Sequence, residues 1–330
     1  YQRTDVIIIG AGISGVVTAY HILRDTPYRV ILIDAHRVGH GASGKNAGYM
    51  LADIERPHKE LVEVFGEEIV KKGLKALDGS WDILDRMRGD LGLSTPIYPC
   101  EGHYGFASLK AFLTELENAY WRHQAGVEMK LFGVSHASAW LSQIPDRYQG
   151  LYEPIDPESI TKIIENVSPV FQAIGYRRMA CGNSALLSEE IVQKLLTRFG
   201  SRVQMFEESH VTEVTCGRSA AQVRSGSVTV DGRWVVLCTN GFEQFHIKDA
   251  DGTALDPKFH TLVQGEVAYM EGFLDDHPQP AQGFMYVNTD KPSEEPYVYV
   301  SRRPFEFDAK DRTLICVGGP EYILPDSGNY

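Results

Sequence analysis

The chain has 330 residues, of which 43% are hydrophobic and 23% charged, and 32 Lys and Arg against 44 Asp and Glu give a net charge of −12. This composition is typical of a globular protein with a full apolar core, and the length predicts two domains. The acidic balance, without any run of Lys or Arg, argues against nucleic-acid binding, because neutralising phosphates needs a clustered basic surface. No stretch approaches the roughly 18 apolar residues that a membrane span requires.

The 5 cysteines are widely scattered. They form no Cys-x-x-Cys pair, so the sequence predicts neither a metal site nor a redox motif. We expect buried, reduced thiols and a cytoplasmic protein. Because the chain opens at Tyr1, an upstream signal or tag could have been lost.

The first predicted elements are a strand, a glycine-rich turn, a helix and a second strand. The segment 5–9 contains a continuous apolar run, which predicts a strand buried on both faces, and Gly10-Ala-Gly-Ile-Ser-Gly15 follows at once. Apolar residues on one face of 16–23 predict the helix, and 29–34 supplies the second strand. Such a unit implies a parallel strand pair in a sheet that is covered on both sides.

Glycines at positions 10, 12 and 15 have the spacing of a dinucleotide-binding turn. Gly10 permits the tight turn, Gly12 lets a diphosphate approach the backbone, and Gly15 lets the helix lie close to the sheet. The N–H groups and partial positive charge at the helix N-terminus favour phosphates there. Asp34 ends the second strand, where a carboxylate can accept hydrogen bonds from ribose hydroxyls and disfavours the 2′-phosphate of NADP. This unit alone does not distinguish NAD from FAD.

Helices and strands alternate irregularly in the rest of the chain. Helical spacing of apolar residues predicts helices over 67–87, 109–120 and 188–199, with glycines at 89 and 92 after the first and Ser188 as the N-cap of the third. His103 and Tyr104 fall on a strand between the long helices. Short β-rich runs predict strands at 203–206, 211–215, 221–224, 228–230, 234–238, 261–270, 296–302 and 312–317, with surface loops at 274–280 and 288–296.

A second small-residue segment, Gly39-His-Gly-Ala-Ser-Gly-Lys-Asn-Ala-Gly48, lies just beyond Asp34. Its backbone N–H groups and the Ser43 hydroxyl could meet a second anionic stretch of a long cofactor. Here the chain resembles the D-amino-acid oxidase/glycine oxidase-type (DAO) family of FAD-dependent amine oxidoreductases, especially members with Gly-Ala-Ser-Gly-(Arg/Lys)-Asn-x-Gly. Two later segments fit this resemblance: 211–214 is similar to the segment that meets adenine, and 235–241 to the family's returning strand and turn. The segments 264–267, 297–303 and 314–319 resemble its substrate-domain strands.

The resemblance implies an α/β fold in which a Rossmann-like FAD-binding domain is interleaved with an α+β substrate domain built on an antiparallel sheet. The expected boundaries are 1–90 and 181–250 for the FAD-binding domain, and 91–180 and 251–330 for the substrate-binding domain. Family members continue past the region of Gly318 into a segment that closes over the flavin, and we expect that segment to be absent from this chain. Residues assigned to FAD binding are Gly10, Gly12, Ile13, Ser14, Gly15, Asp34, Ala35, Ala42, Ser43, Lys45, Asn46, Ala47, Val211, Thr239, Asn240 and Gly241.

The same resemblance implies oxidation of the C–N bond of an amine or amino acid by hydride transfer to FAD, giving an imine that hydrolyses. Oxygen or another acceptor would then take the electrons. Because the flavin carries the chemistry, no catalytic residue is assigned. The substrate-facing candidates are His103, Tyr104, Tyr299 and Arg302, the last because a guanidinium fork suits a carboxylate. Arg302 and Arg303 are adjacent on a strand and point to opposite faces, so at most one of them faces a pocket.

Two other functions stay open at this point. An NAD-dependent dehydrogenase would explain residues 5–34 but leaves the segment 39–48 without a role. A subunit or homologue that binds flavin without turnover is the second alternative. A covalent link between flavin and His40 is a further hypothesis.

Overall fold

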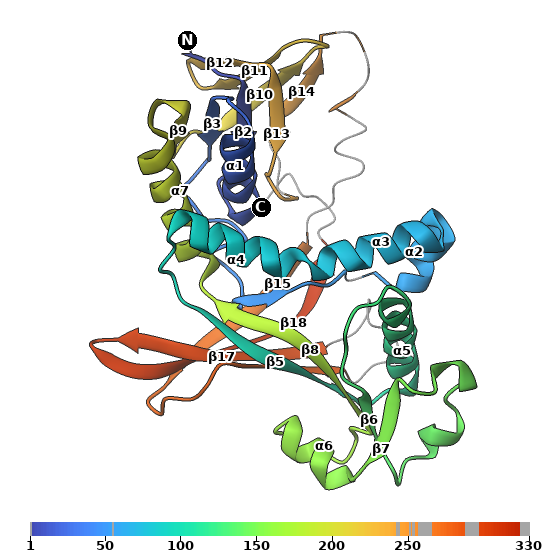
Figure 1. Cartoon of the computed structure of the whole chain (residues 1–330). Coiled ribbons are helices and arrows are strands. Elements are labelled where there is room, and N and C mark those ends of the chain that lie inside the picture. Colours follow the sequence, from blue (N-terminus) through green and yellow to red (C-terminus); the bar gives the residue numbers. More distant parts are fainter. Residues whose placement is uncertain are drawn as a thin grey trace.

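The computed structural model describes residues 2–54, 56–241, 245–250, 252, 255–256, 266–287 and 297–323. Its described residues form three sheets with helices packed around them (Figure 1). A parallel sheet lies with a second sheet at one end of the molecule, and a large, mostly antiparallel sheet lies at the other (Figure 1). This mixed α/β architecture confirms the predicted fold class, whereas the predicted domain boundaries stay a prediction.

The parallel sheet carries the N-terminal unit, and its parallel β2–β3 pair confirms the predicted arrangement. Helices α1 (Ile13–Asp25) and α7 (Ser184–Phe199) pack on one face against Ile8 and Leu32. Ile7 and Ile31 point the other way, into the core shared with the second sheet. Strands buried on both faces need continuous apolar runs, because successive side chains alternate between faces. The strand order is β13 (Trp234–Leu237), β2 (Val6–Ile9), β3 (Val30–Ile33) and β9 (Val203–Phe206).

The second sheet packs on the face of the parallel sheet that lies away from α1. Val214, Val223 and Val230 from three of its strands meet Ile7 and Ile9 in one buried cluster. Its strand order is β1 (Gln2–Arg3), β12 (Val228–Gly232), β11 (Ala221–Ser225), β10 (Val211–Cys216) and β14 (His246–Asp249).

The third sheet has nine strands, and its β5–β16 and β6–β7 pairs are parallel. A short strand, β4 (Tyr49–Leu51), pairs with β8 and brings the end of the glycine-rich segment 39–48 onto this sheet. The order of the remaining strands is β15 (Glu266–Asp275), β18 (Lys310–Ile323), β17 (Tyr297–Phe307), β16 (Gln282–Val287), β5 (Ile97–Phe106), β8 (Ala173–Gly182), β6 (Phe132–Ser135) and β7 (Tyr152–Ile155).

Helices lie between and beside these sheets. Leu84, Met87 and Leu91 of α4 (Ser80–Leu91) belong to the core of the parallel sheet. Val70 and Leu74 of α3 (Glu67–Asp78) pack instead against Trp121 of α5 (Leu109–Gln124). In Figure 1, α4 and α3 cross the middle of the molecule end to end. The remaining helices are α2 (His58–Phe65), α6 (Pro157–Ile163) and the 3-10 turns η1 (Ala139–Ser142), η2 (Asp146–Tyr148) and η3 (Gly200–Arg202).

Two helix predictions need correction. The single helix over 67–87 is instead α3 and α4, which meet at Gly79, whose ψ of −6° departs from helical geometry. Gly92, in the left-handed conformation, ends α4, while Gly89 lies inside it. Helix α7 begins four residues before the predicted Ser188: its N-cap is Asn183, and the Ser188 hydroxyl donates to the carbonyl of Ser184 inside the helix.

Most predicted strands are present, with small shifts at their ends. The strands at 203–206, 211–215, 221–224, 228–230 and 234–238 correspond to β9 to β13, and those at 296–302 and 312–317 to β17 and β18. Residues 266–270 belong to β15, while 261–265 and the predicted loop 288–296 lie outside the described residues. The predicted loop 274–280 begins two residues too early, because Leu274 and Asp275 belong to β15. The sequence did not predict the strands β1, β4, β6, β7, β8, β14 and β16, nor the helices at 58–65 and 157–163.

Candidate functional site

The turn between β2 and α1 has the shape that the glycine spacing predicts. Gly10 has φ of +100°, and a Cβ there would lie 2.2 Å from the carbonyl oxygen of Cys238. At Gly12 a Cβ would lie 2.8 Å from Oγ of Ser43, so a side chain would fill the space in front of the helix N-terminus. Ile13 and Ser14 open α1, whose first N–H groups have no carbonyl partner within the helix. The turn is therefore an anion cradle that depends on glycine.

Asp34 lies directly after β3 and is fixed beside this turn. Its Oδ2 accepts a hydrogen bond of 2.6 Å from the backbone N–H of Ala11, and its Oδ1 accepts one of 2.8 Å from His36. A carboxylate has about four acceptor positions, so lone pairs remain for further donors. Ala35 follows, and the backbone N–H of Ser209 donates to the carbonyl of Asp34, which brings the start of β10 at Val211 close to this acid.

The segment 39–48 folds against the N-terminus of α1. Ser43 Oγ accepts a hydrogen bond of 2.9 Å from the N–H of Ile13. The Asn46 amide donates to the carbonyls of Ala42 and Ser43 at 2.8 Å each and accepts from the N–H of Gly48 at 2.7 Å. Lys45 is exposed and forms no ion pair within the described part of the chain. The segment thus presents a hydroxyl, N–H groups and an uncommitted cation beside the glycine turn.

Residues 239–241 approach the same turn from the neighbouring strand. The N–H of Cys238 donates to the carbonyl of Ile9 at 2.7 Å, and Asn240 has φ of +61°. This places Thr239, Asn240 and Gly241 directly after β13, beside Gly10. The structure therefore brings most of the predicted cofactor residues to one edge of the parallel sheet. The helix N-terminus, the glycine cradle and Asp34 fit the diphosphate and ribose of FAD.

The segment 46–49 then meets one face of the large sheet. The Ser301 hydroxyl of β17 donates to the carbonyl of Ala47 at 2.7 Å, and both residues are buried. The Tyr49 hydroxyl donates to the carbonyl of Phe284 at 3.0 Å and to that of Val300, and its ring meets Tyr299 edge-on at 5.7 Å. Burial raises the pKa of Tyr49 well above its usual range, so this phenol stays protonated and remains a donor.

Arg303 lies on this same face, directly beside the glycine-rich segment. Its Nη1 is 2.7 Å from the position that a Cβ on Gly48 would occupy. The residue is 8% exposed, and Nη1 has no hydrogen-bond partner among the residues that the structure describes. A buried cation with an unsatisfied N–H group is costly unless an anion binds it. Arg303 therefore marks a place for an anionic group next to Gly48.

The four substrate-facing candidates divide between the two faces of the large sheet. Tyr104 and Tyr299 share the face of Arg303, as their register across β5, β16 and β17 requires. Arg302 points to the opposite face, where its Nη atoms bind the Glu165 carboxylate at 2.7 and 2.8 Å. His103 is also on that face and contacts the Gln282 amide at 3.0 Å. Arg303, and not Arg302, is therefore placed to bind an anion near Gly48. The only sign of this in the sequence was the alternation of side chains along a strand, which predicted that the two arginines point to opposite faces.

A network of ion pairs that the sequence did not indicate lies beside Tyr104. Arg122 and Arg177 both bind Asp53 and Glu115, with distances of 3.5 Å for Arg177–Asp53 and 3.2 Å for Arg122–Glu115. Burial alone would raise the pKa of Asp53, but the two guanidinium groups lower it below its usual value. The Arg177 guanidinium lies 5.3 Å from the Tyr104 ring centroid. The two cations and two anions of this network balance each other, whereas Arg303 forms no ion pair with any residue that the structure describes.

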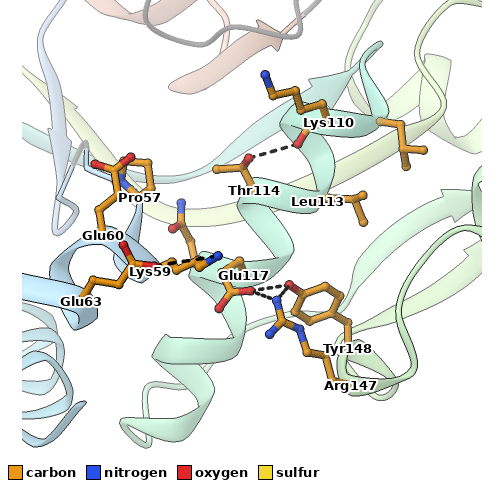
Figure 2. Close-up of a pocket in the computed structure, with 12 residues that line it drawn as sticks. Pro57, Lys59, Glu60, Glu63, Lys110, Leu113, Thr114, Glu117, Arg147 and Tyr148 are labelled. Atoms are coloured by element: carbon orange, nitrogen blue, oxygen red, sulfur yellow. Dashed lines mark hydrogen bonds and ion pairs between the residues drawn. The ribbon is translucent and has the colours of Figure 1, made fainter. Parts of the chain in front are cut away.

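A cleft of about 740 Å³ lies elsewhere, between α2, α5 and η2 (Figure 2). The carboxylate of Glu117 there accepts a hydrogen bond of 2.8 Å from Trp121. It also binds Arg147 and Tyr148, as Figure 2 shows. Burial, and then the Glu117 carboxylate, raise the pKa of Tyr148 to about 12. Within its lining, Lys59 pairs with Glu63 and Arg147 with Glu117, and none of the predicted site residues lines it. The cleft is therefore not the candidate active site.

In the comparison with known proteins, the model of one family matches nearly the whole chain. The model of the family described as FAD dependent oxidoreductase (DAO) matches residues 5–329. A putative Rieske 2Fe-2S iron-sulfur protein of Bacillus subtilis is 24% identical over 297 residues, which are 87% of this chain and 50% of that protein. The chain spans about half the length of the curated relatives that it matches along most of its own sequence.

Two solved structures show a similar fold. The L-proline dehydrogenase of P. horikoshii has a TM-score of 0.63 and 12% identity, covering 98% of this chain and 71% of that chain. The glycine oxidase of Geobacillus kaustophilus has a TM-score of 0.57 and 13% identity, covering 99% of this chain and 74% of that chain. Within the described residues, no helix has the length and apolar character needed to cross a lipid bilayer.

Proposed function

The chain belongs to the family of FAD-dependent oxidoreductases, and from this membership we propose that it oxidises the C–N bond of an amine or amino acid. The observation that carries the proposal is the buried Arg303, whose Nη1 has no partner in the described structure and which lies beside Gly48. The names of two proteins with a similar fold, a proline dehydrogenase and a glycine oxidase, agree with an amino-acid substrate. An NAD-dependent dehydrogenase is set aside, because the cofactor of the family is FAD.

When FAD is bound, it supplies the acceptor for a hydride from the carbon that bears the amine. In this proposal, Gly12, Ile13, Ser14 and Ser43 hold the diphosphate, with Lys45 beside it. Asp34 accepts hydrogen bonds from the ribose. Val211 would contact the adenine end, and Thr239, Asn240 and Gly241 would contribute to holding the cofactor.

Arg303 binds the substrate carboxylate through its guanidinium fork and so fixes the amine-bearing carbon near Gly48. Tyr104 and Tyr299 form apolar walls on the same face, and they exclude water from the reacting carbon. The imine product would be hydrolysed by water, and oxygen or another acceptor would take the electrons.

The test uses the neighbouring arginine as a matched control. We expect Arg303→Gln to raise KM for a carboxylated amine by about 10- to 100-fold, because one charge-assisted contact is lost. Arg302→Gln, which removes the ion pair with Glu165 on the opposite face, should leave KM unchanged. Equal effects of the two substitutions would contradict the role of Arg303.

The reaction itself is tested by the flavin spectrum. The purified protein should be yellow, and anaerobic addition of the right amine should bleach it. D-amino acids, glycine, sarcosine and polyamine derivatives form the screen. A yellow protein that none of these compounds bleaches would favour the alternative of a flavin-binding subunit without turnover.

A further inference from the structure

Two of the cysteines meet on the large sheet, near the candidate site. Sγ of Cys100 on β5 lies 3.9 Å from Sγ of Cys181 on β8. In the β5–β8 ladder, Cys100 is opposite Met179 and Cys181 is opposite Tyr98, so the two thiols sit on one face, offset by one diagonal step. Cys181 in turn pairs with Tyr49 of β4. A disulfide between these two cysteines would therefore lie directly beside the segment 46–49.

The two thiols differ in exposure and in acidity. Cys181 is wholly buried, whereas Cys100 is partly exposed to solvent. The hydrogen bond from the Cys181 thiol lowers the pKa of Cys100. Burial raises the pKa of Cys216 and of Cys238, which lie on other strands. A partly exposed thiol of lowered pKa with a second thiol in contact is the arrangement that favours peroxide oxidation over inert burial.

We propose that Cys100 and Cys181 form a reversible disulfide when the protein meets a hydroperoxide, with Cys100 as the attacking thiol and Cys181 as the resolving thiol. The Cys100 thiolate attacks one oxygen of the hydroperoxide, the O–O bond breaks, and the protonated second oxygen leaves as water or an alcohol. Sulfenic acid is then present on Cys100. The Cys181 sulfur attacks that sulfur, the S–S bond forms, and water leaves. The two thiols lose two electrons and two protons, and the hydroperoxide is reduced by two electrons.

The offset of the two strand positions explains why the bond would be reversible. The sulfurs must approach from 3.9 Å to about 2.05 Å, and two cysteines that are not directly opposite can do so only with some distortion of the strands. Disulfides under strain are the readily reduced ones. The inference does not depend on the proposed amine oxidation, because it needs only the two thiols and the peroxide.

The experiment is peptide mapping of the whole protein. The reduced protein is treated with hydrogen peroxide at a small molar excess, then denatured, alkylated and digested, so that burial does not protect any thiol. We expect a linked peptide pair that contains Cys100 and Cys181. Neither thiol should then be alkylated, and both should become alkylatable again after treatment with dithiothreitol. Cys216 and Cys238 should stay fully alkylatable. If both Cys100 and Cys181 stay alkylatable, or if Cys181 links to Cys316 instead, the proposal is overturned.

Single substitutions assign the two roles. Cys181→Ser should leave sulfenic acid on Cys100, detected as a dimedone adduct, because no resolving thiol remains. Cys100→Ser should abolish both the adduct and the linked peptide, while Cys216→Ser serves as the matched control and should behave as the unmodified protein. A dimedone adduct on Cys181 in Cys100→Ser, as strong as that on Cys100 in Cys181→Ser, would refute the assignment.

Discussion

At the scale of single residues, Gly12 decides whether the helix N-terminus is open to a phosphate. A Cβ at this position would lie 2.8 Å from Ser43 Oγ, and the branched side chain of Gly12→Val would fill the space beyond it. We expect this substitution to abolish retention of FAD, measured as flavin absorbance per protein after gel filtration.

Two further variants give comparisons for the flavin content of Gly12→Val. Asp34→Ala should lower flavin content less, because the glycine cradle remains after the ribose contacts are lost. Gly73→Ala, at an exposed position in α3 with nothing within 4 Å of the added Cβ, should leave flavin content unchanged. Full flavin content in Gly12→Val would be incompatible with the proposed cofactor site.

Glu190 is a residue whose charge state should control stability at low pH. Its carboxylate accepts four hydrogen bonds of 2.6 to 2.7 Å from the backbone and hydroxyl groups of Ser94 and Thr95. Partial burial would raise its pKa, but these hydrogen bonds lower the pKa to about 2. Because the folded pKa lies below the unfolded value of about 4.3, this stabilisation is present in full above pH 4.3 and is lost as pH falls towards 2.

Glu190→Gln should therefore lower the free energy of unfolding by about 1–2 kcal/mol near neutral pH, because an amide cannot accept all four hydrogen bonds. The difference from the unmodified protein should shrink as pH falls from about 4.3 towards 2. Urea unfolding at several pH values measures both effects. A difference that stays constant across this range would show that the carboxylate charge is not the cause.

At the scale of elements, replacing a glycine by alanine should change the stability in opposite directions in α3 and in β6. Gly73 is exposed within α3 and has open space around it, so Gly73→Ala should raise the free energy of unfolding by about 0.5–1 kcal/mol through helix propensity. Gly133 in β6 is buried, and a Cβ there would lie 2.3 Å from Cδ1 of Ile155. Gly133→Ala should lower stability, and thermal unfolding of both variants makes the comparison.

At the scale of the whole molecule, Tyr49 joins the N-terminal glycine segment to the large sheet. Its hydroxyl donates to carbonyls of β16 and β17, and its ring contacts Tyr299. Tyr49→Phe keeps the ring and removes the hydrogen bonds to the carbonyls of Phe284 and Val300, which should cost about 1–3 kcal/mol of unfolding free energy. The control is Tyr269→Phe, at a side chain that is 73% exposed, where chemical denaturation should detect no change. An equal loss in both variants would mean that the hydroxyl contact is unimportant.

The elements of this protein differ in how far local sequence predicts them. The strands β2 and β3 follow from uninterrupted apolar runs, because burial on both faces requires them. The sequence did not predict strand β8, because Arg177 lies in its middle. This side chain is 11% exposed and forms ion pairs with Asp53 and Glu115, residues distant in sequence. The break at Gly79 was missed too, since one glycine in a helical pattern does not reveal whether the helix continues.

The sequence by itself predicted the half of the candidate site that we propose to bind the nucleotide. Gly10, Gly12, Gly15 and Asp34 act within one short β-turn-α-β unit, whose geometry follows from local rules and from the burial of its strands. Only the tertiary structure decided which residues face the other side of the site. Arg302 and Arg303 are chemically alike and adjacent, and their roles differ because Glu165 meets one face of β17 while Ala47 and Gly48 meet the other. Contacts between segments more than a hundred residues apart depend on how the sheets pack, and no local pattern encodes them.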